Sequence, residues 1–251
     1  MSLWLLRLLG STGYALAVAA GVVSAMLGVF LARYNPWLLP LTMTLFIYPI
    51  FVLDLRLKAS WKAVAHVLLW ALASSVVIAS YSYFFPEQAG ATVIKGREYF
   101  NEMLHWIYTG QGPEGDPNLF LKPKFIELGA FISLTALTGG FAGLFLGSYL
   151  LNYMNFYVGT LATMVSGIKL PILLVFSWPI YAILRVIGYV NLGVYFSVPL
   201  LRIFKIVHLK EKDVREHLII GLTLVAFDFI LKATIANALY QPMLRELVLG
   251  S

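Results

Sequence analysis

The chain has 251 residues, of which 60% are hydrophobic and only 12% are charged, and its mean hydropathy is +0.84. Soluble domains carry about a quarter charged residues, so this composition excludes a water-soluble globular protein and predicts one all-α transmembrane domain over residues 1–251. The net charge of +6 lies mostly between the apolar runs, where basic residues set orientation and contact lipid headgroups, so we expect a lipid bilayer and no nucleic acid as partner.

Apolar runs predict a bundle of about seven transmembrane helices, or six if the fifth and sixth form one long helix or a re-entrant pair. The expected spans are 13–32, 37–53, 61–85, 126–151, 156–185, 186–204 and 218–240. The first run is too long for the apolar region of a signal peptide, so we expect it to be a span. Basic residues of the short loops place the N-terminus in the cytoplasm, and we expect the plasma (inner) membrane.

Residues 86–125 form the only long connection between the predicted spans, an outward loop of about 40 residues of the kind that is functional or mobile. Within it, residues 97–108 have Phe100, Leu104 and Ile107 on one helical face and charged residues beside them. This pattern predicts a short amphipathic helix that could lie on the membrane surface.

Acidic residues and one histidine in this loop form a second candidate site, with Glu98, Glu102, His105, Glu114 and Asp116. Glu102 and His105 have the Glu-x-x-His spacing that puts two metal ligands on one helical face. A di-iron bundle needs a second such pair, and the chain has none, because Glu216 and His217 are adjacent. An ordinary solvated face is therefore the favoured interpretation, and no metal is expected.

Small residues mark the fourth predicted span, 126–151. Gly139, Gly143 and Gly147 lie four residues apart, the spacing that allows helices to approach closely. We expect this helix to be the central packing helix of the bundle. The same glycines could hold a second copy of the chain or a partner membrane subunit.

The sequence predicts a helix break at residues 166–171 of the fifth predicted span, where Gly167 is followed by Lys169 and Pro171. A proline cannot donate a backbone hydrogen bond and disfavours helical geometry in the preceding residue. One interpretation is a discontinuous helix that exposes backbone dipoles near the membrane midplane, as in transporters. The other is a kink or helix end with Lys169 extended to the interface.

The last predicted span, 218–240, carries Asp228 and Lys232 near its middle. Residues four apart share a helical face, so the two side chains can form an ion pair within the helix. Charges at this depth are costly and are functional by default, with a named partner expected for each. We expect Asp228 to pair with Lys232 or with Lys169.

This Asp-to-Lys spacing resembles the retinal-binding helix of microbial rhodopsins, where the lysine forms a Schiff base. Arg33, Tyr34, Trp37 and Leu38 are similar to that family's RYxxWL motif, and Trp178 with Pro179 is similar to its aromatic retinal cage. In that family the arginine motif lies on the third helix, whereas here one span precedes it. We therefore assign no family and expect no retinal.

The resulting hypothesis is a small transporter or channel-like protein with a polar midplane site of Asp228, Lys232 and Lys169 beside the break at Gly167 and Pro171. The alternative is a membrane-embedded accessory or scaffold subunit. A membrane enzyme acting through the outer loop is a third hypothesis, without positive support, because the chain lacks cysteine, HExxH, GxSxG and a P-loop. We expect no cofactor.

Overall fold

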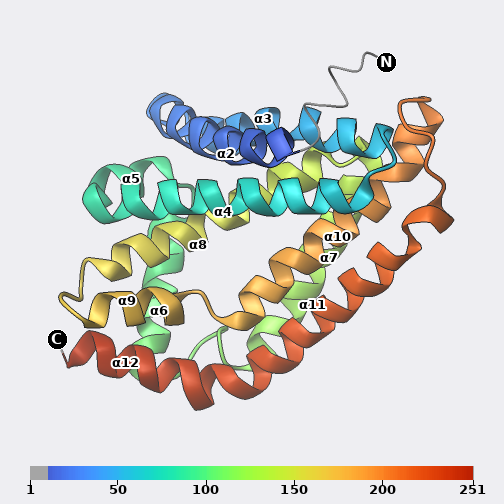
Figure 1. The fold of residues 1–251 in the computed structure, drawn as a ribbon. Helices are drawn as coiled ribbons and strands as arrows, with labels where there is room; N and C mark the ends of the chain where they lie inside the picture. Colours follow the sequence, from blue (N-terminus) through green and yellow to red (C-terminus); the bar gives the residue numbers. More distant parts are fainter. Residues whose placement is uncertain (1–10, 251) are drawn as a thin grey trace.

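The computed structural model describes residues 11–250, which are helical and contain no strand (Figure 1). This confirms the all-α class. The helices, in chain order, are α2 (Ser11–Ala32), α3 (Leu38–Arg56), α4 (Ser60–Phe84), α5 (Pro86–Thr92), α6 (Gly96–Thr109), α7 (Pro117–Thr138), α8 (Phe141–Ala162), α9 (Lys169–Ser177), α10 (Ile180–Ile203), the 3₁₀-helix η1 (Glu211–Val214), α11 (Arg215–Ile235), the π-helix η2 (Ala236–Tyr240) and α12 (Gln241–Leu249).

Five described segments are long and apolar enough to cross a membrane, and they mark the chain as a membrane protein. They are Gly13–Ala32, Leu38–Arg56, Ser60–Phe84, Ile180–Ile203 and Glu211–Leu249. The predicted count of about seven spans is not confirmed. The difference arises in the middle of the chain, where α7 carries several charged residues and where the predicted span boundaries differ from the observed helices.

The first three predicted spans correspond to α2, α3 and α4, which pack against one another along one side of the bundle (Figure 1). Before α3, the Asn35 side chain accepts a hydrogen bond from the Trp37 amide at 3.0 Å, which shapes the turn after α2. At the other end of α3, Asp54 Oδ2 lies 2.7 Å from His66 Nδ1 of α4, and both side chains are fully buried. This pair ties α3 to α4.

The predicted span 126–151 is wrong, because the chain turns at Gly139 and Gly140. Both glycines have positive φ, 61° and 99°, a backbone conformation that glycine adopts without steric cost and that commonly ends helices. The Gly140 amide donates to the Thr135 carbonyl at 2.9 Å. Two helices, α7 and α8, therefore form a hairpin in place of one straight span.

This turn changes the meaning of the glycine pattern. A Cβ on Gly143 would collide with the Thr135 hydroxyl of α7, so Gly143 serves the close approach of the two hairpin helices. A Cβ on Gly147 would meet open space. The pattern that predicted helix packing is thus used within the chain at its first two positions, and the partner contact expected there stays a prediction.

Helices fill most of the predicted outer loop, 86–125. The predicted short helix forms as α6, but it buries Met103, Trp106 and Ile107 and packs against α8 and α12. Trp106 Nε1 donates to Asn237 Oδ1 at 2.7 Å, which ties α6 to the π-helix η2. The residues predicted as an outward loop therefore belong to the packed bundle.

The chain does break near the position predicted in the fifth span, but earlier than expected, since α8 ends at Ala162 and α9 begins at Lys169. A second break follows at Trp178 and Pro179, and α10 begins at Ile180. The predicted boundary between residues 185 and 186 is therefore wrong. Proline fixes its own φ and suits the start of a helix, so Pro179 sets the boundary and leaves Arg185 inside α10.

Helix α8 is the centre of the fold, because it packs against α3, α4, α6 and α7. It packs tightly on α4, where a Cβ on Gly159 would overlap the backbone carbonyl of Ala79. Nearby, Asn155 Nδ2 donates to Ser75 Oγ of α4 at 2.9 Å. The absence of a side chain at residue 159 therefore sets the distance between the two helices.

We expect Gly159→Ala to lower the stability of the protein by about 1–3 kcal/mol, because α8 must move away from α4 to admit the methyl group. Gly129→Ala is the matched control: nothing lies within 4 Å of a Cβ at that helical position, and alanine gains about 0.5–1 kcal/mol over glycine in a helix. Thermal unfolding in detergent should shift downward for the first variant and upward for the second. Equal shifts would contradict close α4–α8 packing.

Candidate functional site

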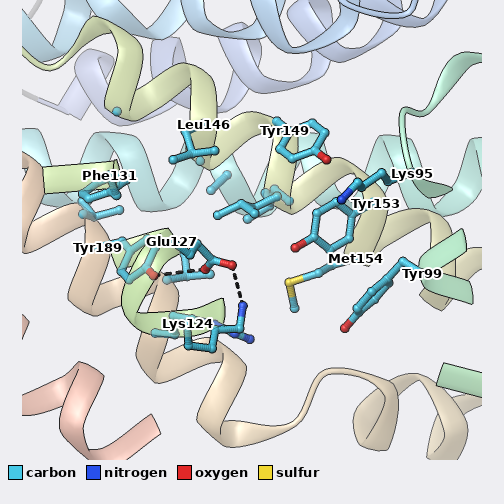
Figure 2. Close-up of a pocket in the computed structure, with 18 of the residues that line it drawn as sticks. Lys95, Tyr99, Lys124, Glu127, Phe131, Leu146, Tyr149, Tyr153, Met154 and Tyr189 are labelled. Atoms are coloured by element: carbon cyan, nitrogen blue, oxygen red, sulfur yellow. Dashed lines mark hydrogen bonds and ion pairs between the residues drawn. The ribbon is translucent and has the colours of Figure 1, made fainter. Parts of the chain in front are cut away.

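A cavity of about 530 Å³ lies inside the helix bundle, where α3, α4, α6, α7, α8, α10 and α11 meet (Figure 2). Its lining has two chemically different parts. The helices α3, α4 and α8 contribute no charged side chain to it, and they present mainly apolar residues such as Trp70 and Leu151. The charged side chains come from the other helices and their linkers. They are Lys95, Glu98, Glu102, Glu114, Lys124, Glu127, Arg185 and Lys232.

Glu114 and Lys232 form a buried ion pair at this cavity. Lys232 Nζ of α11 donates to Glu114 Oε2 at 2.9 Å, and the Tyr181 hydroxyl of α10 donates to Glu114 Oε1 at 2.8 Å. The Lys232 ammonium also lies 5.0 Å from the centre of the Phe120 ring, a favourable cation–π distance. Both carboxylate oxygens and the ammonium of this pair are thus engaged.

The charge state of Glu114, in the linker between α6 and α7, follows from these contacts. Burial by itself raises the pKa of the Glu114 carboxyl, but the Lys232 ammonium, the Arg185 guanidinium and the Tyr181 hydroxyl favour the ionised form. Together they bring the pKa of Glu114 below its ordinary value. The contacts of Glu114 therefore favour its ionised carboxylate form.

A second ion pair repeats this pattern on α7. Lys124 Nζ donates to Glu127 Oε2 at 2.7 Å, and the Tyr189 hydroxyl of α10 donates to Glu127 Oε1 at 3.0 Å. Figure 2 shows Glu127 between Lys124 and Tyr189. In both clusters one glutamate accepts from one ammonium and one tyrosine, so the charges are satisfied without water.

Arg185 and Asp228 form a looser third pair. Arg185 Nε lies 3.7 Å from Asp228 Oδ2, which is too long for a hydrogen bond. Asp228 is fully buried, and neither of its oxygens has a hydrogen-bond partner among residues 11–250. Arg185 is only 8% exposed, lines the cavity, and makes no hydrogen bond within the described part of the chain. Its guanidinium donors are therefore unused.

The structure separates the residues of the first predicted site. Asp228 and Lys232 lie on one face of α11, as expected, but each pairs with another helix or linker, Arg185 and Glu114 respectively. Lys169 is half-buried and donates to the Gly250 carbonyl near the end of α12. Gly167, with a φ of 64°, lies in the turn before α9, and Pro171 lies in the first turn of that helix. Neither Gly167 nor Pro171 lines the cavity.

The structure also separates the residues of the second predicted site. Glu98, Glu102 and Glu114 line the cavity, whereas His105 is exposed on α6. Asp116 caps α7, its Oδ1 accepting from the Asn118 amide at 2.9 Å. Among residues 11–250, no three His, Asp or Glu side chains gather in a group that could hold a metal ion.

Three cavity residues escaped the sequence interpretation: Lys124, Glu127 and Arg185. Lys124 and Glu127 are three residues apart, a spacing that puts opposite charges side by side on a helix, so the pattern was present in the sequence. Arg185 stands alone in a long apolar run. An unaccompanied intramembrane arginine is a signal for a functional site in its own right.

No protein-family model matches this chain, and neither a curated protein nor a solved structure matches it. The inference of function therefore rests on the cavity and its charged residues.

We expect Lys232→Met to destabilise the protein by about 3–5 kcal/mol, because the variant leaves the Glu114 carboxylate buried without its cation. Removing both charges with Lys232→Met and Glu114→Gln should recover most of that loss. Arg97→Met is the matched control, since its partner Glu87 is exposed and such surface pairs contribute about 0–1 kcal/mol. Thermal unfolding in detergent measures all three. Equal losses for Lys232→Met and Arg97→Met would contradict the buried pair.

Proposed function

We propose that this protein is an integral membrane transporter whose substrate binds in the central cavity. One observation carries the proposal: charged side chains from apolar helices line this cavity. Arg185 of α10 and Lys232 of α11 lie in segments apolar enough to span a membrane, and both side chains line the cavity. Ionisable residues in membrane helices are costly and commonly face substrate or ion pathways. Known small-molecule sites occupy about 300–1,000 Å³, a range that includes this cavity.

The three ion pairs support different roles. Glu114 with Lys232, and Glu127 with Lys124, have their strong donors and acceptors engaged, so we assign them to holding the shape of the charged wall. Arg185 retains free donors on the cavity surface, and we assign it to the substrate. Asp228 does not line the cavity. It acts on the substrate through Arg185, as the counter-ion that holds the guanidinium.

This proposal revises the site expected from the sequence. Asp228 and Lys232 remain in it, while Lys169 and the break at Gly167 and Pro171 do not contribute. Glu114, taken from the second predicted site, joins the first. The scaffold alternative has less support from the fold, because Gly139 and Gly143 serve the α7–α8 hairpin.

A transporter must expose its binding cavity to each side of the membrane in turn. The chain contains no cysteine, so single cysteines can be placed without further changes. Gly147 lines the cavity and has open space where a side chain would start. We therefore expect a charged, membrane-impermeant thiol reagent to label Gly147→Cys in proteoliposomes, both when added outside and when enclosed inside.

Leu222→Cys is the matched control. Leu222 is 46% exposed on α11 and lies outside the cavity lining, so lipid should shield its thiol and keep it un-ionised. It should react with neither application of the reagent. Labelling of Gly147→Cys from one side only would contradict transport, and absence of labelling from both sides would contradict a water-accessible cavity.

A further inference from the structure

A second cavity, of about 290 Å³, adjoins the first between α4, α8 and α10. Its lining is almost entirely apolar, and its two polar side chains, Ser75 and Asn155, hydrogen bond to each other at 2.9 Å. Four residues line both cavities: Ala71, Leu151, Met154 and Val186. The two cavities therefore share part of their apolar lining, and the second cavity is a space fit for hydrocarbon.

The second cavity reaches the outer surface of the bundle. Leu72 of α4 and Ile183 of α10 belong to its lining, and they are 57% and 44% exposed. Both helices are candidate membrane spans, so apolar side chains exposed on their outer surface face lipid. Met154 lines both cavities and lies between them. Its unbranched side chain adapts readily to new neighbours.

The charged side of the central cavity offers one group with unused hydrogen-bonding capacity, the Arg185 guanidinium. It is nine-tenths buried and lines the cavity, and its ion-pair partner, Asp228 Oδ2, lies 3.7 Å away. A planar guanidinium binds carboxylates and phosphates through two parallel hydrogen bonds. The neighbouring cations Lys124 and Lys232 are each paired with a glutamate of the cavity lining, so Arg185 is the cation that a bound anion would contact.

We propose that the substrate is an anionic amphiphile with one hydrocarbon chain, which enters laterally from the bilayer between α4 and α10. The carboxylate or phosphate of its head group binds Arg185, and its chain occupies the second cavity. This inference rests on the proposed function and narrows it to a lipid-class substrate. It requires a head group and a chain on the same molecule, since Arg185 lies in the central cavity and the second cavity has no charged side chain in its lining.

The test uses the full chain in lipid nanodiscs and a fatty acid that carries a photoreactive diazirine near the end of its chain. We expect crosslinks at the second cavity, on α4 and α10 near Leu72 and Ile183. An unlabelled fatty acid should displace the probe, whereas a monoacylglycerol of equal chain length, acetate and inorganic phosphate should not. Displacement by acetate or phosphate alone would overturn the requirement for a chain, and equal displacement by the monoacylglycerol would overturn the requirement for an anion.

Ile183→Trp tests the binding site of the hydrocarbon chain, and Arg185→Lys tests the binding site of the head group. Ile183 lines the second cavity but not the central cavity, so Ile183→Trp fills the second cavity alone. We expect labelling of this variant by the photoreactive fatty acid to fall about tenfold, a loss of about 1.4 kcal/mol in binding. Ile219→Trp, on the exposed surface of α11 and outside both cavities, should leave it unchanged. Arg185→Lys keeps the charge but loses the two-pronged contact, so the preference for fatty acid over monoacylglycerol should fall while the chain still crosslinks. Equal labelling of the Ile183 and Ile219 variants would overturn lateral entry.

The two proposals fail separately. If Gly147→Cys reacts from both sides of the membrane and the probe crosslinks no more at α4 and α10 than on other lipid-facing helices, the protein transports a substrate of another class. If the probe crosslinks specifically and Gly147→Cys reacts from one side only, the protein binds lipid without transporting it. The first result overturns the inference on the substrate, and the second overturns transport.

Discussion

The cost of holding charge away from water is the constraint on which this structure depends. Lys232 of α11 is buried, and it is tolerated because Glu114, in the linker before α7, lies 2.9 Å from it. Tyr181 of α10 completes the carboxylate's hydrogen bonds. Three segments distant in the sequence are thereby fixed in one arrangement. A second cluster, made of Lys124, Glu127 and Tyr189, joins α7 to α10 in the same way. Two ion-pair clusters therefore hold the charged wall of the cavity together.

The other wall depends on the turn at Gly139 and Gly140. Positive φ at both glycines reverses the chain, so α7 brings Lys124 and Glu127 to the cavity while α8 presents its apolar and aromatic residues to the same space. Helix α8 in turn packs closely on α4 at Gly159, which joins the hairpin to the first three helices. The cavity has one charged and one apolar wall because the two helices of the hairpin, α7 and α8, differ in composition.

Arg185 differs from the other paired cations of the cavity because it makes no hydrogen bond to its carboxylate. The glutamates of the other two pairs each accept from a cation and a tyrosine, whereas Arg185 and Asp228 face each other at 3.7 Å without a hydrogen bond. Buried polar groups are normally satisfied, and an exception calls for an explanation. A bound anion supplies one, because it would use the guanidinium donors that the fold leaves free. The apolar cavity beyond Met154 then determines which kind of anion the site suits.

Local patterns in the sequence determined the helical class, the first three spans, the short helix at 97–108 and the presence of Asp228 and Lys232 inside an apolar helix, because hydropathy and helical periodicity act over a few residues. Partner choice is not local. The nearest expected partner of Lys232 was Asp228, one turn away, yet its carboxylate comes from a residue 118 positions earlier. Gly139 and Gly143 suit a straight packing helix as well as a hairpin, and the positive φ of Gly139 together with the close approach of Gly143 to Thr135 distinguishes them. Tertiary structure decided these points, since it alone sets which charges meet once water is excluded.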